Sequence, residues 1–173
     1  MTRRYAVYYA PPPRSPLALF GAAWLGRDAE SGESLAPHDL YQITVDRWRA
    51  AISAPASFGF HATLMPEQAD GIAPLAARCV KELDRFRAPP SAAELDRRRA
   101  KCLSAAQEEL LQHWGYPYVL QEFRFHLTLT GNLPDAEADI FEAALETRFA
   151  PLREQRVAVD DICIFRQETR QDD

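Results

Sequence analysis

A seven-residue pattern occurs twice in this chain and limits what it can fold into. Residues 58–64 and 123–129 share five of seven positions, in the form Phe-x-Phe-His-x-Thr-Leu. In both copies apolar and polar side chains alternate with a period of two, which is typical of a half-buried strand. A match of this length arises by chance in such a chain with a probability on the order of a tenth, so the repeat alone is modest evidence. We predict strands over Ser57–Leu64 and Glu122–Thr130.

The polar positions that both copies share carry the chemistry. His61 and Thr63, and likewise His126 and Thr128, lie two residues apart on one face of a strand, about 7 Å from each other at the backbone. Two such strands facing each other would bring two imidazoles and two hydroxyls to one cleft. One histidine could then act as general base and the other as general acid, while the hydroxyls donate to phosphate oxygens. This set suits the cleavage of a phosphodiester.

Further residues are candidates for substrate binding, each with a structural alternative. Arg124 shares the face of His126 and is either a phosphate clamp or a surface arginine, since Gly59 stands at its place in the first copy. Tyr8 either lines the cleft or packs in the core. The threonines are also good strand formers, and the histidines could be polar residues on a solvent face. The candidate substrate-binding residues are Thr63, Thr128, Arg124, Tyr8 and Tyr118.

The sequence indicates neither a metal site nor a cofactor. The four histidines form no HxH or HxxxH pair, and the three cysteines form no CxxC pair. The sequence also contains no GxxxxGK[ST] and no GxGxxG pattern, which disfavours a ligase-like or a hydride-transferring enzyme. We therefore expect a reaction that needs no metal and no cofactor.

The two motifs resemble the signature of the two-histidine (2H) phosphoesterase superfamily, which has one H-x-[ST]-hydrophobic motif in each of two lobes. Here they read His61-Ala62-Thr63-Leu64 and His126-Leu127-Thr128-Leu129. Several stretches further resemble the phosphonate-metabolism proteins of carbon–phosphorus lyase operons: residues 5–8, 11–12, 20–26, 58–64, 114–118 and 122–131.

This resemblance implies an α+β fold with two pseudo-symmetric lobes. Each lobe would be an antiparallel sheet with outer helices, and the active-site cleft would lie between the lobes. We expect one domain over residues 1–173, with lobe 1 at about 1–65 and lobe 2 at about 70–168. The two motifs are closer in sequence than such lobes require. Either this chain carries a deletion or residues are missing between 64 and 70, and we favour missing residues.

The resemblance also implies the activity. We expect a metal-independent phosphodiesterase that hydrolyses a small cyclic phosphodiester, a ribose-phosphate cyclic ester of phosphonate metabolism, with His61 and His126 as catalytic residues. Alternative substrates are a nucleoside 2′,3′-cyclic phosphate or an RNA end. A binding module for a phosphate ligand, without catalysis, is the competing class of function. The net charge of −5 disfavours long nucleic acid as a partner.

The remaining patterns predict helices and a cytoplasmic protein. Prolines interrupt the apolar residues near the N-terminus, so we expect no export signal, and no apolar run is long enough to cross a membrane. The oligomeric state stays open. We predict strands over 5–9 and 157–165, helices over 17–24, 45–52, 72–86 and 136–149, and two helices capped by Ser91 and Ser104.

Overall fold

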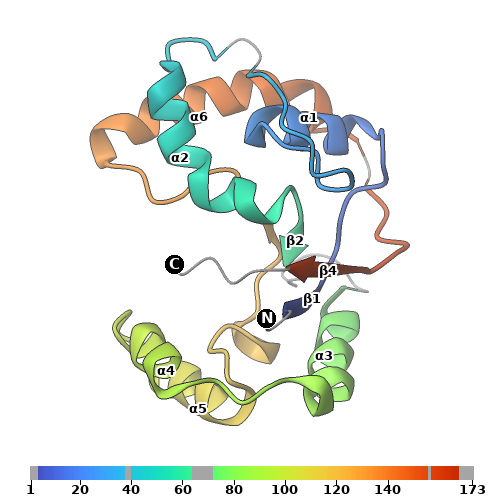
Figure 1. Ribbon diagram of the computed structural model, residues 1–173, viewed down its shortest axis with the longest axis vertical. Helices are drawn as coiled ribbons and strands as arrows, with labels where there is room; N and C mark the ends of the chain where they lie inside the picture. The colour runs from blue at the N-terminus through green and yellow to red at the C-terminus, as the bar shows by residue number, and fades with distance from the viewer. Residues whose placement is uncertain (1–3, 38–39, 64–71, 156, 168–173) are drawn as a thin grey trace. The chain divides into compact units, whose positions relative to one another are not determined.

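The computed structural model describes residues 4–37, 40–63, 72–155 and 157–167 (Figure 1). The fold is α+β, and most of its regular structure is helical. The chain divides into two compact units. Unit 1 comprises Met1–Ala62 together with Leu127–Asp173, and unit 2 comprises Thr63–His126.

Three helices build unit 1: α1 (Pro16–Leu25), α2 (Val45–Phe58) and α6 (Asp135–Phe149), the last followed by a short 3₁₀ turn over Ala150–Leu152. Helix α1 begins where the sequence predicts, because the Ser15 hydroxyl accepts from the Ala18 amide and Pro16 occupies the first turn. It ends at Gly26, whose φ of 62° is left-handed. The Thr44 hydroxyl caps α2 in the same way.

The core of unit 1 lies among these helices, which gather together in Figure 1. The Trp48 indole N–H donates to the carbonyl of Trp24 at 2.8 Å, which fastens α2 to α1 inside the core. Burial of such large apolar side chains is the main force that stabilises the unit. The buried cluster comprises Leu17, Trp24, Leu25, Ile43, Trp48, Ala51, Ile52, Phe60, Phe141 and Ala144.

Strands β1 (Arg4–Tyr8) and β4 (Cys163–Gln167) form an antiparallel pair in unit 1. In their register, Ala6 lies opposite Phe165 and Tyr8 lies opposite Cys163. Side chains alternate between the two faces of a strand, so Tyr8 and Phe165 share one face while Ile164 is on the other. Ile164 is 72% exposed.

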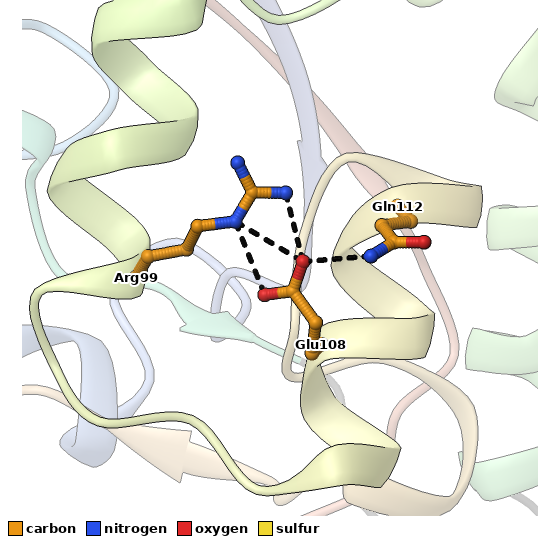
Figure 2. Close-up of polar contacts among 3 residues, drawn as sticks. All are labelled: Arg99, Glu108 and Gln112. Atoms are coloured by element: carbon orange, nitrogen blue, oxygen red, sulfur yellow. Dashed lines mark hydrogen bonds and ion pairs between the residues drawn. The ribbon is translucent and has the colours of Figure 1, made fainter.

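Unit 2 is helical: α3 (Ile72–Leu83), α4 (Ala92–Arg99), α5 (Ala105–Trp114), and 3₁₀ turns over Asp84–Phe86 and Leu120–Glu122. The guanidinium of Arg99 on α4 pairs with the Glu108 carboxylate on α5 at 2.7 Å, and Gln112 donates to the same carboxylate (Figure 2). The arginines of α4 are therefore at least partly neutralised by acidic neighbours, since Arg98 also pairs with Glu94.

The helix predictions are confirmed, and two helix boundaries change. Helix α2 runs six residues past the predicted end at Ile52, to Phe58, with Pro55 inside it. The Arg27 guanidinium supports this extension, because it donates to the carbonyls of Ala56 and Ser57 at the helix end. The predicted helix over 72–86 is α3 followed by a 3₁₀ turn.

The long strands predicted over the repeat are wrong. Within the described residues, the first copy contributes β2 (Ala62–Thr63) and the second contributes β3 (His126–Leu127), and these two short strands pair with each other. Groups on α1 and α2 form hydrogen bonds with backbone atoms in and just after the second copy, where a neighbouring strand would otherwise bind. The Trp24 indole donates to the Leu129 carbonyl at 2.9 Å, and the Gly131 amide donates to the Ala51 carbonyl at 2.7 Å.

The last predicted strand, over 157–165, is also displaced, because β4 begins only at Cys163. Within the residues that the structure describes, there are two sheets of two strands each. The expected pair of lobes, each with its own larger antiparallel sheet, is not present there. The lobe boundaries at 1–65 and 70–168 remain a prediction. The proposed break between 64 and 70 lies outside the described residues. No helix in the described part of the chain is both long and apolar enough to cross a membrane.

Candidate functional site

His61 is positioned by the residue before it. Phe60 is 3% exposed and its ring lies directly against Gly21 of α1, so closely that a Cβ at Gly21 would overlap it. The Phe20 ring contacts Phe60 edge-on, with ring centroids 6.4 Å apart. Anchoring Phe60 in the core fixes the backbone that carries His61, whose own side chain is half-buried.

The His61 ring is held by a backbone carbonyl two residues earlier. Its Nδ1 lies 2.8 Å from the carbonyl oxygen of Gly59. A carbonyl oxygen can only accept a hydrogen bond, so Nδ1 carries the proton and Nε2 is the ring atom that can accept a proton from a ligand or, once protonated, donate to one. Gly59 has a φ of 73°, and a Cβ there would lie 2.9 Å from the Ala29 Cβ. This position therefore favours glycine.

Two aromatic rings of the β1–β4 pair contact His61. The Tyr8 ring centroid lies 4.1 Å from that of His61, at an interplanar angle of 43°. The Phe165 centroid lies 5.6 Å from His61 and 5.4 Å from Tyr8. Tyr8, His61 and Phe165 thus form one aromatic cluster, which we call the Tyr8–His61–Phe165 cluster. The prediction that Tyr8 binds substrate stays a prediction.

Part of the second copy packs on the same core as the first. Leu127 and Leu129 are half-buried against the cluster that contains Phe60. Thr128 stands between them in sequence and is exposed. The alternation predicted for Leu127 to Leu129 is therefore present, although these residues do not form a long strand.

The other half of the second copy belongs to unit 2 and partly departs from the predicted alternation. Phe123 is buried, but Phe125 is 36% exposed. His126 and Arg124 are both exposed. His126 Nδ1 lies 3.1 Å from the Arg124 carbonyl oxygen, which repeats the bond between His61 and Gly59 two residues apart. Each histidine thus makes the same kind of contact, with the carbonyl two residues earlier.

Tyr118 packs within unit 2. Its ring meets that of Tyr116 edge-on, with centroids 5.7 Å apart, and the Arg98 guanidinium lies 4.7 Å from the Tyr116 ring centroid. Thr63 is placed in β2 by its backbone, but its side chain lies outside what the structure describes. Among the described residues there is no group of three or more His, Cys, Asp or Glu side chains that could hold a metal ion.

The residue next to Tyr8 is a buried phenol with a raised pKa. Tyr9 is 1% exposed and its hydroxyl donates to the Ala158 carbonyl at 3.3 Å. Burial raises the pKa of Tyr9, and the negative charges of Asp160 and Cys163 raise it further. Tyr9 thus remains a neutral hydrogen-bond donor that ties β1 to the segment before β4.

The model of one protein family matches residues 44–173 of the chain. The chain belongs to the DUF1045 family. That family is described as a protein of unknown function. No solved structure matches the chain closely enough to indicate its fold.

Two curated relatives carry a functional name. Both are called ribose 1,5-bisphosphate phosphokinase PhnN. The protein of Janthinobacterium sp. (strain Marseille) is 32% identical over 215 residues, covering 95% of this chain and 48% of the relative. The protein of Laribacter hongkongensis (strain HLHK9) is 32% identical over 190 residues, covering 84% of this chain and 44% of the relative. The chain therefore spans about half the length of these relatives.

These findings correct the functional expectations from the sequence. The assignment to the two-histidine phosphoesterase superfamily is replaced by membership of the DUF1045 family. The expected cyclic phosphodiesterase, a hydrolase, is also wrong. The relatives are named as phosphokinases, which transfer a phosphoryl group instead of hydrolysing a diester.

Sequence reasoning missed three residues that shape the surroundings of His61. Gly59 supplies the carbonyl for Nδ1, Gly21 admits the Phe60 ring, and Phe165 contacts the imidazole. The short glycine-containing turn before His61 was a local signal for the first. The other two depend on contacts between residues far apart in the sequence, and no local pattern reports those.

Proposed function

We propose that this chain acts in the ribose 1,5-bisphosphate phosphokinase reaction of phosphonate metabolism and binds the phosphorylated ribose. The observation that carries the proposal is the 32% identity to a protein of that name over 95% of this chain. A match that covers nearly all of the chain supports a role in the same reaction. The substrate then is a small sugar bearing two phosphates.

The sequence favours the sugar phosphate over the phosphoryl donor as the ligand of this chain. Many kinases that use a nucleoside triphosphate cradle its phosphates with a GxxxxGK[ST] loop. The 173 residues contain no such pattern. The relatives are about twice as long as the part that this chain matches. We therefore assign the phosphoryl donor to the part of the relatives that this chain does not match.

His61 is the proposed phosphate ligand of unit 1. Its Nδ1 proton is directed to the Gly59 carbonyl, so a protonated ring would present a second N–H at Nε2 to a phosphate oxygen. A hydrogen bond between charged groups of this kind contributes about 1.5–3 kcal/mol. Thr128, exposed in the same unit, is the proposed hydroxyl donor.

In unit 2 the proposed phosphate ligands are His126 and Arg124, both exposed. The guanidinium of an arginine binds phosphate oxygens bidentately, which suits Arg124 to the role. Thr63 and Tyr118 stay proposed substrate-binding residues on the ground of their place in the sequence.

Calorimetric titration of the chain with ribose 1,5-bisphosphate tests the proposal, with ribose 5-phosphate and inorganic phosphate as comparison ligands. We expect the bisphosphate to bind at least about tenfold more tightly than ribose 5-phosphate, because the second phosphate adds charged hydrogen bonds. Equal affinity for the bisphosphate and for inorganic phosphate, or no binding, would overturn it. With labelled ATP, the chain alone should transfer no phosphoryl group to the bisphosphate. Transfer by the chain alone would show that the donor site is not confined to the part of the relatives that this chain does not match.

A further inference from the structure

The Tyr8–His61–Phe165 cluster constrains the imidazole of His61 from two directions. The Gly59 carbonyl accepts a hydrogen bond from Nδ1 at 2.8 Å. The Tyr8 and Phe165 rings contact the imidazole at centroid distances of 4.1 and 5.6 Å. A hydrogen bond alone leaves a ring able to tilt about the bond, whereas packed neighbours remove that freedom.

The register between β1 and β4 decides which residue of β4 contacts the His61 ring. Ala6 lies opposite Phe165, so Phe165 shares a face with Tyr8 two residues further along β1. A shift of one residue would turn Ile164 to this face and Phe165 away. In the observed register Phe165 is half-buried and Ile164 is 72% exposed. The pairing of β1 with β4 thus places the Phe165 ring against His61, although the two residues are about a hundred positions apart in the sequence.

We propose that Phe165 and Tyr8 are positioning residues that hold the His61 ring in one orientation, with its proton on Nδ1. The expected effect on ligand affinity rests on the proposed function, since it is measured with ribose 1,5-bisphosphate. The tautomer and orientation of the ring do not depend on that ligand. Neither aromatic side chain needs to touch the substrate in order to act in this way.

The test compares Phe165→Leu with Ile164→Leu, which changes the adjacent residue on the opposite face of the same strand. Nitrogen-15 NMR of the neutral His61 ring should show protonation at Nδ1 in the unmodified chain and in Ile164→Leu. In Phe165→Leu the signals should shift toward a mixture of both tautomers. Phe165→Tyr and Tyr8→Phe keep an aromatic ring and should retain the Nδ1–H form, whereas Tyr8→Leu should lose it.

Binding is the second readout. Phe165→Leu should weaken binding of ribose 1,5-bisphosphate roughly tenfold, because a misoriented imidazole loses about one charged hydrogen bond to the phosphate. Phe165→Tyr should restore affinity to within about twofold, and circular dichroism should show that each variant is folded.

Two outcomes would overturn this inference. One is an Nε2–H ring in the unmodified chain, and the other is a Phe165→Leu variant that matches Ile164→Leu in tautomer and, where the bisphosphate binds, in affinity. If the unmodified chain does not bind ribose 1,5-bisphosphate, the proposed function fails, and the NMR comparison still decides the positioning role.

Discussion

The rings of Tyr8 and His61 lie with their centroids 4.1 Å apart, although 52 residues separate them in the sequence. Tyr8 reaches this place as the last residue of β1, and His61 as the residue after the buried Phe60. The contact joins the small β1–β4 sheet to the end of the segment that follows α2. It also surrounds the histidine of the first motif with aromatic rings that no local sequence pattern predicts.

Removal of the His61 imidazole should weaken ligand binding. His61→Ala is expected to raise the Kd for ribose 1,5-bisphosphate by roughly ten- to a hundredfold, because one charged hydrogen bond is lost. Calorimetric titration measures the change. His113→Ala is the matched control, since His113 is an exposed histidine of α5 whose ring contacts that of Trp114 within unit 2. An equal loss in both variants would contradict a specific role for His61.

A methyl group at Gly21 should destabilise unit 1. Gly21→Ala places a Cβ in the space of the Phe60 ring, so the ring must move or the helix must shift. Overpacking of this kind costs about 1–3 kcal/mol. Urea denaturation followed by tryptophan fluorescence gives the free energy of unfolding. The control is Gly131→Ala, where the new Cβ would meet the Ala51 carbonyl oxygen at an ordinary 3.4 Å; this variant should lose far less.

The cap of α5 should contribute to the local stability of unit 2. The Ser104 hydroxyl accepts from the Gln107 amide, and the Gln107 side chain accepts from the Ser104 amide. Ser104→Ala should cost about 1 kcal/mol, measured as faster hydrogen exchange of the amides in the first turn of α5. Ser91→Ala on α4 removes the matching bond from the Glu94 amide and should speed exchange in the first turn of α4 by a similar amount. Unchanged exchange in the first turn of α5 in Ser104→Ala would contradict the role of the cap.

Tyr9 should make the chain less stable in alkaline solution. Its pKa lies above the ordinary value of 10.0, first because of burial and then because of Asp160 and Cys163. In the unfolded chain the phenol loses its proton at the ordinary value, so the unfolded state binds fewer protons as the pH rises through that value. The contribution of Tyr9 is therefore fully present below pH 10 and is lost as the pH rises toward the folded pKa.

Denaturation at about pH 8 and about pH 10.5 measures this effect. The fall in the free energy of unfolding should be smaller in Tyr9→Phe, which has no phenol to ionise, than in the unmodified chain. Tyr41→Phe, at a position that is 62% exposed, should leave the fall unchanged. Identical falls in the unmodified chain and in Tyr9→Phe would show that other groups cause the alkaline loss.

Local chemistry made the helices predictable. Ser15 followed by Pro16, Thr44, Ser91, and Ser104 with Gln107 each mark a helix start that the structure confirms. A cap depends on residues within one turn, so a short stretch of sequence contains all the information needed. The alternation of Leu127, Thr128 and Leu129 was likewise readable, because burial on one side leaves a local pattern.

The sequence by itself therefore determined the helix starts, the α+β class and the residues of the repeated motif. Only the tertiary structure decided that the motif forms two very short strands, since the indole of Trp24 and the carbonyl of Ala51 bind the backbone near Leu129 and Gly131. It also decided that Phe165 and Tyr8 surround His61. The reason is physical: caps and alternation arise between near neighbours in sequence, whereas strand register and ring contacts arise between segments that meet only when the chain has folded.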